Sequence, residues 1–177
     1  MRSVDELIRA GEQPEYLYFW GHQPSADGVG ASCLSQWWPA EFVVAGRAYP
    51  TAGHFMMSEK ALLFGAADIA GQILRAAEPK EAKELGRQIV GFDEQRWTER
   101  RVEVVLEGNL AKFGQHPALR DYLLGTGDAV LVEASPVDRI WGIGLAAGDE
   151  RAARPETWRG LNLLGFVLME VRSRLAM

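Results

Sequence analysis

The sequence has few of the residues that build disulfide-bonded or metal-held frameworks. Cys33 is the only cysteine among 177 residues, so no disulfide forms within the chain and a disulfide-rich secreted scaffold is excluded. His22, His54 and His116 are far apart and lack metal-ligand spacing. The segment 142–144 has two glycines but neither the third glycine nor the βαβ unit of a dinucleotide loop. We therefore expect no metal site and no cofactor.

Long apolar runs and an excess of basic charge are also absent. The longest apolar run, 161–169, is interrupted by Asn162 and is too short to span a bilayer. Asp5, Glu6 and Arg9 lie among the first apolar residues, unlike a signal peptide. The net charge is −5 with both signs interspersed, which disfavours a broad surface for nucleic acid. These features predict a cytosolic protein with no membrane partner.

The residues that are present favour one domain over 1–177, because 47% of them are apolar and can form a sizeable core. Alternation and aromatic content predict a buried strand, a hairpin and a later strand, over 16–20, 42–49 and 129–134. Apolar residues at helical spacing predict helices over 3–12, 51–64, 66–77, 80–90, 94–113, 117–124 and 161–175. Two long loops, 21–32 and 135–156, are of a length that often carries function. The expected fold class is α+β, mostly helical with a small β-sheet.

The longest expected helix, 94–113, has two different faces. Its apolar stripe is expected to consist of Val102, Leu106, Leu110 and Phe113. Its basic residues Arg96, Arg100 and Arg101 are interspersed with Glu94, Glu99 and Glu103, which is typical of a solvated face with ion pairs.

Gly53 is the residue that fits its surroundings least. Thr51 is the expected N-cap of the helix over 51–64, because its hydroxyl can accept a hydrogen bond from a free backbone N–H. A glycine in the first turn of a helix costs roughly 1 kcal/mol relative to alanine. Gly53 and Lys60 share a helix face, so this face is expected to present a basic group and, at position 53, a void.

The surrounding segment resembles the NADAR family, also called YbiA-like proteins. The match consists of Pro50, Thr51, Ala52, His54, Phe55 and Lys60. It fails at Gly53, where the family has a glutamate that is held to be catalytic. Further blocks follow in the family's order: Leu34-Ser35-Gln36-Trp37-Trp38-Pro39, Trp97 in the long helix, Val132 to Gly144, and Gly160 to Gly165.

The resemblance implies hydrolysis of the C–N bond at the anomeric carbon of ribose, through a transition state that resembles an oxocarbenium ion. It implies that Asp138 and Lys60 are catalytic, with Gly53 as the vacated position of the glutamate. The residues that it implies for substrate binding are His54, Trp97, Trp141, Gly142, Asn162, Ser35 and Trp37.

Each of these residues also has a structural interpretation. Asp138 can cap its own loop, and the tryptophans can be core residues. His54 can be a hydrogen-bonded residue of the helix start, and Asn162 can be a helix cap. In a site, Lys60 can hold a phosphate, pair with Asp138 or attack through its amine; otherwise it is an exposed helix lysine. Glu59 does not replace the missing glutamate, because six residues from position 53 place it off that face.

Three functional hypotheses follow. The first is an N-glycosidase, impaired at Gly53, that acts on an N-ribosyl phosphate of the riboflavin-pathway type or on an ADP-ribosylated nucleobase. An ADP-ribosylated nucleic acid is not favoured as a partner, because the chain lacks a basic face. The second is a non-catalytic module that binds ADP-ribose or an NAD-like ligand. A further interpretation of position 53 is that the glycine was introduced to trap a complex. The third, a purely structural domain, is disfavoured by the aromatic-rich loops.

Overall fold

The computed structural model describes residues 1–11, 13–24 and 28–177. Residues 25–27 of the loop expected over 21–32 lie outside the described part. The chain forms two compact units: unit 1 comprises Met1–Ser35 and Pro117–Met177, and unit 2 comprises Gln36–His116. Helices α1 to α7 and two small two-stranded sheets make up the described residues, which confirms the α+β class.

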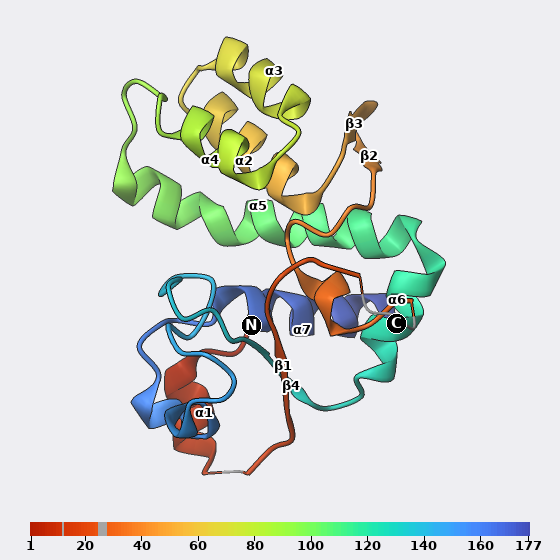
Figure 1. The fold of residues 1–177 in the computed structure, drawn as a ribbon, viewed down its shortest axis with the longest axis vertical. Coiled ribbons are helices and arrows are strands. Elements are labelled where there is room, and N and C mark those ends of the chain that lie inside the picture. Colours follow the sequence, from red (N-terminus) through yellow and green to blue (C-terminus); the bar gives the residue numbers. More distant parts are fainter. Residues whose placement is uncertain (12, 25–27) are drawn as a thin grey trace. The chain divides into compact units, whose positions relative to one another are not determined.

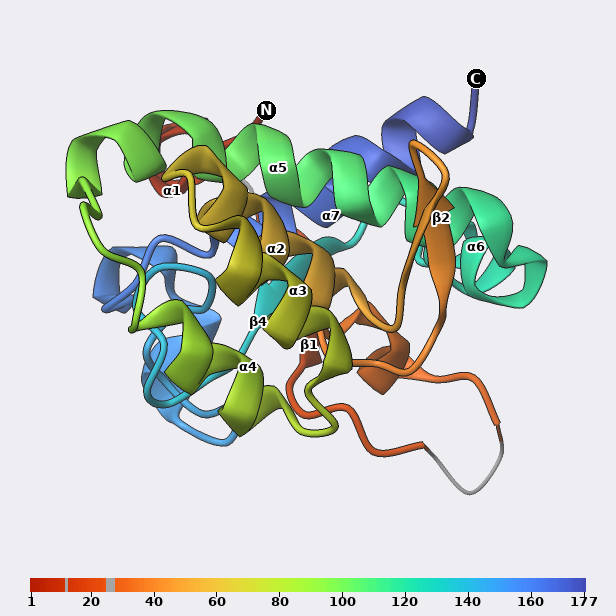
Figure 2. The ribbon, with the colours of Figure 1, turned by 90° about the horizontal axis from the view of Figure 1, so that it is seen from above.

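Unit 2 is a helical assembly built around one buried helix. It contains the antiparallel hairpin β2 (Phe42–Val44) and β3 (Arg47–Tyr49), followed by α2 (Ala52–Leu63), α3 (Ala67–Arg75), α4 (Pro79–Gly86) and α5 (Glu94–Gln115). Helix α2 packs against α3, α4 and α5 (Figures 1 and 2). Because neighbours cover α2 on several sides, it is buried along most of its length rather than along one stripe.

Helix α2 begins where the sequence predicts. The Thr51 backbone is extended, and its hydroxyl oxygen accepts a hydrogen bond from the His54 N–H at 3.2 Å. The Gly53 N–H, another unpaired donor of the first turn, donates to the Gln36 carbonyl at 2.7 Å. The aromatic rings of Phe42, Tyr49 and Phe55 pack together beneath this start, with centroids 4.9–6.0 Å apart. The segment 36–37 is thereby attached to the N-terminal turn of α2.

The buried face of α5 differs from the predicted stripe. Val102, Leu106 and Leu110 are only half-buried, and of the predicted stripe only Phe113 is buried. The buried residues of α5 are Trp97, Arg101, Val104, Val105, Gly108, Asn109, Lys112 and Phe113. The buried face of α5 therefore includes charged and amide side chains, which apolar periodicity alone predicts to be exposed.

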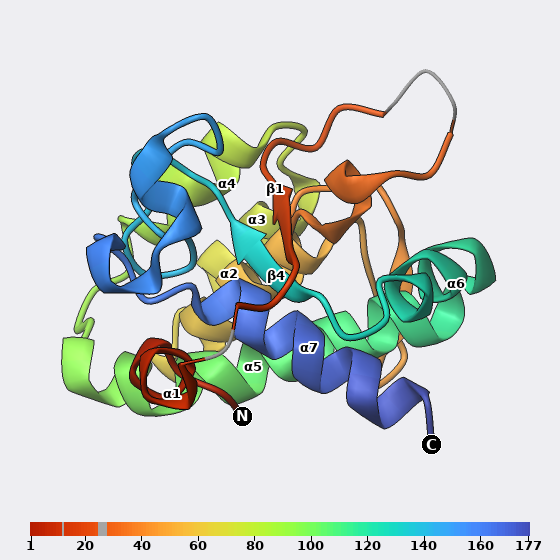
Figure 3. The ribbon, with the colours of Figure 1, turned by 90° about the horizontal axis from the view of Figure 1, so that it is seen from below.

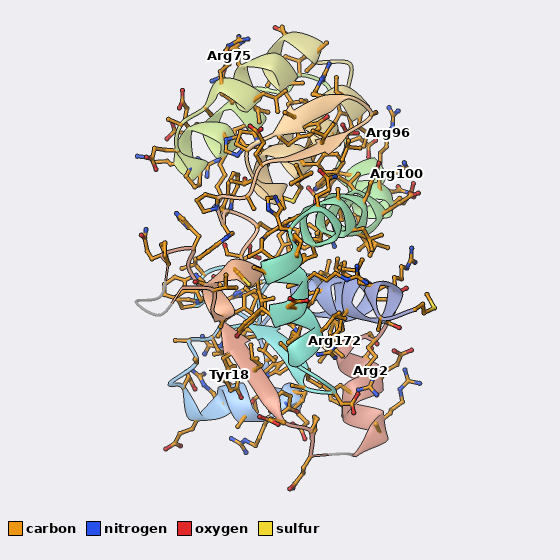
Figure 4. The ribbon with its side chains drawn as sticks, turned by 90° about the vertical axis from the view of Figure 1, so that its right-hand side faces the viewer. Arg2, Tyr18, Arg75, Arg96, Arg100 and Arg172 are labelled. Carbon is orange, nitrogen blue, oxygen red and sulfur yellow. The ribbon has the colours of Figure 1, made fainter. Side chains whose placement is uncertain are left out.

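The prediction for Arg101 is also wrong: this residue was expected on the solvated face of the helix, but it is only 8% exposed. Arg96 and Arg100 do lie on the exposed side of α5 (Figure 4), and Arg100 forms an ion pair with Glu103. Gly108 is required on the inner side, because a Cβ there would lie 2.6 Å from the ring of Phe55. The glycine lets α2 approach α5 closely.

Helix α4 is shorter than predicted, ending at Gly86 rather than near Val90. Arg87 is the C-cap of α4. Gly91, in the connection to α5, has a positive φ of 75°, a conformation that favours glycine. The connection leaves two apolar side chains at the surface: Val90 is 86% exposed and Phe92 is 40% exposed.

Unit 1 is built on two parallel strands from opposite ends of the chain. Strand β1 (Tyr16–Phe19) pairs with β4 (Val130–Glu133), with Tyr16 opposite Val130 and Phe19 opposite Glu133. Helix α7 (Leu163–Leu175) packs on β4, and Figure 3 shows both strands beside this helix. The expected strand over 16–20 is one residue shorter and less buried than predicted, since Trp20 is 61% exposed.

The remaining elements of unit 1 are α1 (Val4–Ala10), α6 (Pro117–Gly125) and the short 3₁₀ turns η1 (Ala31–Leu34), η2 (Glu150–Ala153) and η3 (Pro155–Thr157). Helix α1 has a full capping box, in which Ser3 and Glu6 bond each other's backbone N–H. The core of this unit contains Leu7, Val130, Val132, Ile143, Leu145 and Ala152. No helix in the described ranges is long and apolar enough to cross a membrane.

Candidate active site

The space beside Gly53 is filled by Trp37. A Cβ placed on Gly53 would lie 2.5 Å from Cε3 of the indole and 2.6 Å from both Cδ2 and Cζ3. Such distances are far below van der Waals contact, so no side chain fits at position 53 while the ring stays in place. The void expected at Gly53 is therefore wrong: an aromatic ring lies directly on the backbone of the helix.

The Trp37 ring is held in place from other sides as well. The Lys83 ammonium lies 5.5 Å from its centroid, within the range of a cation–π interaction. The His54 imidazole meets it nearly edge-on, at 5.6 Å and 71°. The indole itself is half-buried. Unit 2 thus brings three predicted site residues together, Gly53, His54 and Trp37, with a partly accessible aromatic ring among them.

His54 has a structural role in this arrangement. It is 3% exposed, with Nδ1 2.8 Å from the Thr51 hydroxyl and Nε2 2.9 Å from the Ala76 carbonyl oxygen. Since a carbonyl can only accept, Nε2 carries the proton and Nδ1 accepts from Thr51. Both ring nitrogens are occupied, which matches the hydrogen-bonded helix start and leaves no nitrogen for a ligand.

Lys60 lies two turns further along α2, and its ammonium is enclosed by aromatic rings. Nζ lies 4.5 Å from the centroid of Phe92 and 5.6 Å from that of Trp97. The side chain is half-buried, and burial lowers the pKa of the Lys60 amine while the nearby Glu94 carboxylate raises it. The predicted residues Lys60 and Trp97 therefore meet in unit 2, and Lys60 is not an ordinary exposed helix lysine.

Phe92 was missed by the sequence analysis. Its ring packs edge-on against Phe64 at 5.2 Å and 60°, and Arg96 lies over Phe64 at 5.7 Å. The available signal was an aromatic residue directly after Gly91, between two predicted helices, where loops are usually polar. A pattern based on helix faces does not assign a residue that lies between helices.

Glu59 lies in a different environment from Gly53, as the helical spacing predicts. Burial is the main cause that raises the pKa of its carboxyl, the Glu107 carboxylate raises it further, and Arg47 lowers it. These neighbours come from β3 and α5. Glu59 therefore does not replace the missing glutamate.

Asn109 and Gln36 form a buried amide pair in unit 2. Asn109 Nδ2 donates to Gln36 Oε1 and to the Val105 carbonyl, both at 2.8 Å. In the described part of the chain Asn109 Oδ1 and Gln36 Nε2 have no hydrogen-bond partner. The pair fixes the segment that carries Trp37.

In unit 1, Asp138 organises the loop that follows β4. Its Oδ1 accepts hydrogen bonds from the backbone N–H groups of Ile140 and Trp141, both at 2.8 Å, and its own N–H donates to the Ser135 hydroxyl at 3.1 Å. This is the loop cap that the sequence analysis gave as the structural interpretation. Oδ1 is occupied, so a role toward a ligand falls to Oδ2.

Gly142 is required by close packing within the same loop. A Cβ there would lie 2.8 Å from the Glu133 carbonyl oxygen and 3.1 Å from that of Asp138. Trp141 beside it is half-buried. The absence of a side chain at Gly142 therefore allows the loop to pack closely against the end of β4.

Asn162 connects the start of α7 to β4. It is 0% exposed and has a left-handed backbone with φ of 51°. Its Oδ1 accepts from the Glu133 N–H at 3.0 Å, and its Nδ2 donates to the Leu131 carbonyl at 2.9 Å. The side chain makes no cap bond to α7, so it completes the edge of β4 and is not placed for a ligand. Ser35 is buried at the end of η1.

Among the described residues, no group of three or more His, Cys, Asp or Glu side chains is placed to hold a metal ion. The predicted residues form separate groups within each unit. In unit 2, Gly53, His54 and Trp37 form one group, and Lys60 and Trp97 form another. In unit 1, the group consists of Asp138, Trp141, Gly142 and Asn162.

Comparison with known proteins assigns the family. A model described as the NADAR domain matches residues 18–176. An N-glycosidase of Acanthamoeba polyphaga mimivirus is 39% identical over 166 residues, which are 91% of this chain and 96% of that protein. A riboflavin biosynthesis protein of Vibrio vulnificus is 32% identical over 164 residues, which are 93% of this chain but 39% of that protein.

A solved structure agrees. The NMR structure of the Escherichia coli protein YbiA matches with a TM-score of 0.73 and 27% identity, covering 93% of this chain and 87% of that one. The sequence resemblance to the family is thus confirmed over nearly the whole chain. The protein belongs to the NADAR domain family.

Proposed function

We propose that this chain is an N-glycosidase that cleaves an N-ribosyl phosphate, with a rate lowered by the absence of a carboxylate at Gly53. The family and the name of the mimivirus relative support the reaction class. The observation that carries the proposal is the Lys60 amine, which is half-buried against Phe92 and Trp97 on the same helix as Gly53.

The chemistry follows from the charge that develops on the sugar. When the C–N bond of an N-riboside breaks, positive charge builds up on the ribose ring. A missing general acid or base typically costs about 10²–10⁴-fold in rate. The amine of Lys60 can take part by attack: Nζ bonds to the anomeric carbon and the bond to the base breaks. The base leaves with the electron pair of that bond and takes up the proton that Nζ releases. Water then hydrolyses the sugar–lysine adduct. Burial, which lowers the pKa of Lys60, increases the neutral fraction that attack requires.

Substitution of Lys60 separates attack from simple charge. Lys60→Arg keeps a cation that can hold a phosphate but cannot attack, whereas Lys60→Ala removes both functions. We expect both variants to lose release of the base from an N-ribosyl phosphate, measured by the absorbance of the free base. Lys80→Ala is the matched control, because the Lys80 side chain is 88% exposed. Full activity of Lys60→Ala would refute the proposal, and activity of Lys60→Arg alone would reduce Lys60 to a phosphate contact.

A second candidate function, a non-catalytic module that binds ADP-ribose, is supported by Trp37. Its half-buried ring covers the backbone of Gly53, and such a ring suits stacking on a nucleobase. Thermal unfolding with ADP-ribose tests this function, because a ligand that binds the folded state raises the melting temperature. A rise that Trp37→Ala removes, together with no release of base, would favour the binding module over the enzyme.

Asp138 is a proposed catalytic residue in unit 1, and two substitutions distinguish its charge from its cap. Asp138→Asn keeps an oxygen for the two backbone N–H groups that Oδ1 now accepts. Asp138→Ala removes the charge and the cap together. If the carboxylate acts on the substrate, both variants lose activity, and Asp138→Asn does so without a change in melting temperature. An active Asn variant would leave Asp138 as a loop cap alone.

The substrate class is proposed from charge and family. An N-ribosyl phosphate is favoured over ADP-ribosylated nucleic acid, because the net charge of −5 would repel a polyanion. Parallel assays with an N-ribosyl phosphate and an ADP-ribosylated guanine distinguish the two.

A cytosolic location is a prediction from the sequence, testable by fractionation of cells.

A further inference from the structure

Lys60 is enclosed from two sides by rings of different character. Trp97, on α5, is 8% exposed, whereas Phe92, in the connection before α5, is 40% exposed. Both rings lie within reach of the same Nζ, and Phe92 is the closer at 4.5 Å. Trp97 is therefore the buried wall beside the amine, and Phe92 is the wall on the solvent side.

Phe92 is itself supported by further contacts within unit 2. Phe64, which caps the end of α2, meets it edge-on at 5.2 Å, and Arg96 covers Phe64. The charged groups that bear on this cluster are Glu94, which acts on Lys60, and Arg96. These contacts hold the partly exposed ring of Phe92 between Lys60 and Phe64. Val90, two residues earlier in the same connection, is almost fully exposed.

We infer that Phe92 is a positioning residue for Lys60: its ring holds the ammonium against Trp97 and shields it from water. The inference rests on the proposed function in that Lys60 is the group that meets the substrate. The ring acts in two ways. Its negative face attracts the ammonium, which favours the protonated amine, and its bulk excludes water, which favours the neutral amine. The two effects oppose each other, so they can be separated by changing one at a time.

Two replacements of Phe92 change the ring's electrostatics while keeping its bulk. Phe92→Leu keeps an apolar cover without a ring face. Pentafluorophenylalanine at position 92 has nearly the same shape as phenylalanine, but its ring face repels a cation. Val90→Ala is the matched control, because it removes an exposed apolar side chain two residues away. Since Phe92 is a surface residue, we expect all three variants to fold.

The measurement is the pKa of Lys60 itself, which does not depend on catalysis. The chain has four lysines, so after ¹³C-methylation the NMR signals can be assigned by substituting each lysine in turn. We expect the pKa of Lys60 to fall by about 0.4–0.7 pH unit in Phe92→Leu and further in the fluorinated variant. In Phe92→Leu the methyl signal of Lys60 also loses the part of its ring-current shift that comes from Phe92, while the part from Trp97 remains. Val90→Ala changes neither value.

An unchanged pKa and an unchanged methyl shift in both Phe92 variants would overturn the inference, as would an equal effect of Val90→Ala. The release of base by the same variants then tests the proposed function separately. If Phe92 positions the reacting amine, Phe92→Leu lowers kcat more than it raises KM, even though the lower pKa of Lys60 enlarges the neutral fraction that can attack. If the pKa of Lys60 shifts while hydrolysis stays the same, Phe92 still positions Lys60, and it is the catalytic role of Lys60 that fails.

Discussion

Gly53→Ala tests the packing of Trp37 on α2 with a single atom. On helix propensity alone, alanine would stabilise this turn by roughly 1 kcal/mol. The structure predicts the opposite, because the new Cβ would lie 2.5 Å from the indole. Forcing an extra carbon into a packed region typically costs about 1–3 kcal/mol, so the net change is a loss of roughly 0–2 kcal/mol. Glutamate adds a buried charge and should destabilise further.

The assay is urea unfolding of the single and double variants. Gly71→Ala is the matched control, because Gly71 also lies inside a helix and the nearest atom to its Cβ is Arg75 Nη1 at 3.9 Å. We expect Gly71→Ala to stabilise unit 2 by roughly 0.5–1 kcal/mol. Trp37→Ala should remove the penalty at position 53, giving a coupling of about 1–3 kcal/mol between the two sites.

Two results would refute this reasoning. If Gly53→Ala stabilises the protein as much as Gly71→Ala does, Trp37 does not occupy the space beside the helix. If the penalty persists in the Trp37→Ala background, its cause lies elsewhere. The same cycle bears on function, because hydrolysis can be restored by glutamate at position 53 only where the ring can move. We therefore expect Gly53→Glu with Trp37→Ala to be the better test of a restored N-glycosidase.

The other predictions concern buried polar groups. Glu59→Gln should raise stability at pH 7, because burial and Glu107 raise the pKa of the Glu59 carboxyl and so make its ionised form costly in the folded state. The gain should vanish as the pH falls below that pKa, and a gain that persists there would contradict the assignment. Asn162→Ala and His54→Ala should each destabilise by on the order of 1–3 kcal/mol for every buried group left unpaired, as measured by urea unfolding. A loss below about 0.5 kcal/mol in either would show that solvent replaces those bonds.

Local signals predicted most of the elements but few of their contacts. Helix α2 begins after the predicted N-cap Thr51, and helix α4 begins at Pro79, one residue before the predicted start. The ring of Trp37 at Gly53 was not predictable, because it joins segments separated by a hairpin. Helical spacing places residues on a face but does not indicate which neighbour covers that face.

Helix α5 illustrates the limit for amphipathic patterns. Its sequence offers two adjacent faces, one through Val102 and Leu106 and one through Val104 and Gly108. The second is buried, because Gly108 admits the Phe55 ring and a bulkier face would not. The buried Arg101 follows from that choice. Among the site residues, the loop cap of Asp138 and the helix-start hydrogen bonds of His54 were among the predicted alternatives, whereas Phe92 lies outside any helical pattern.

The pairing of β1 with β4 has a consequence for the order in which the molecule is made. A ribosome releases β1 early, but its partner strand comes only after all of unit 2 has been synthesised. Unit 2 is one continuous stretch, so its helices can pack against one another before β4 has been synthesised. Strand β1 must wait with its backbone N–H and C=O groups unpaired, a state in which it can join the edge of another sheet. Chaperone demand during synthesis should therefore come from residues 16–19 rather than from the helices.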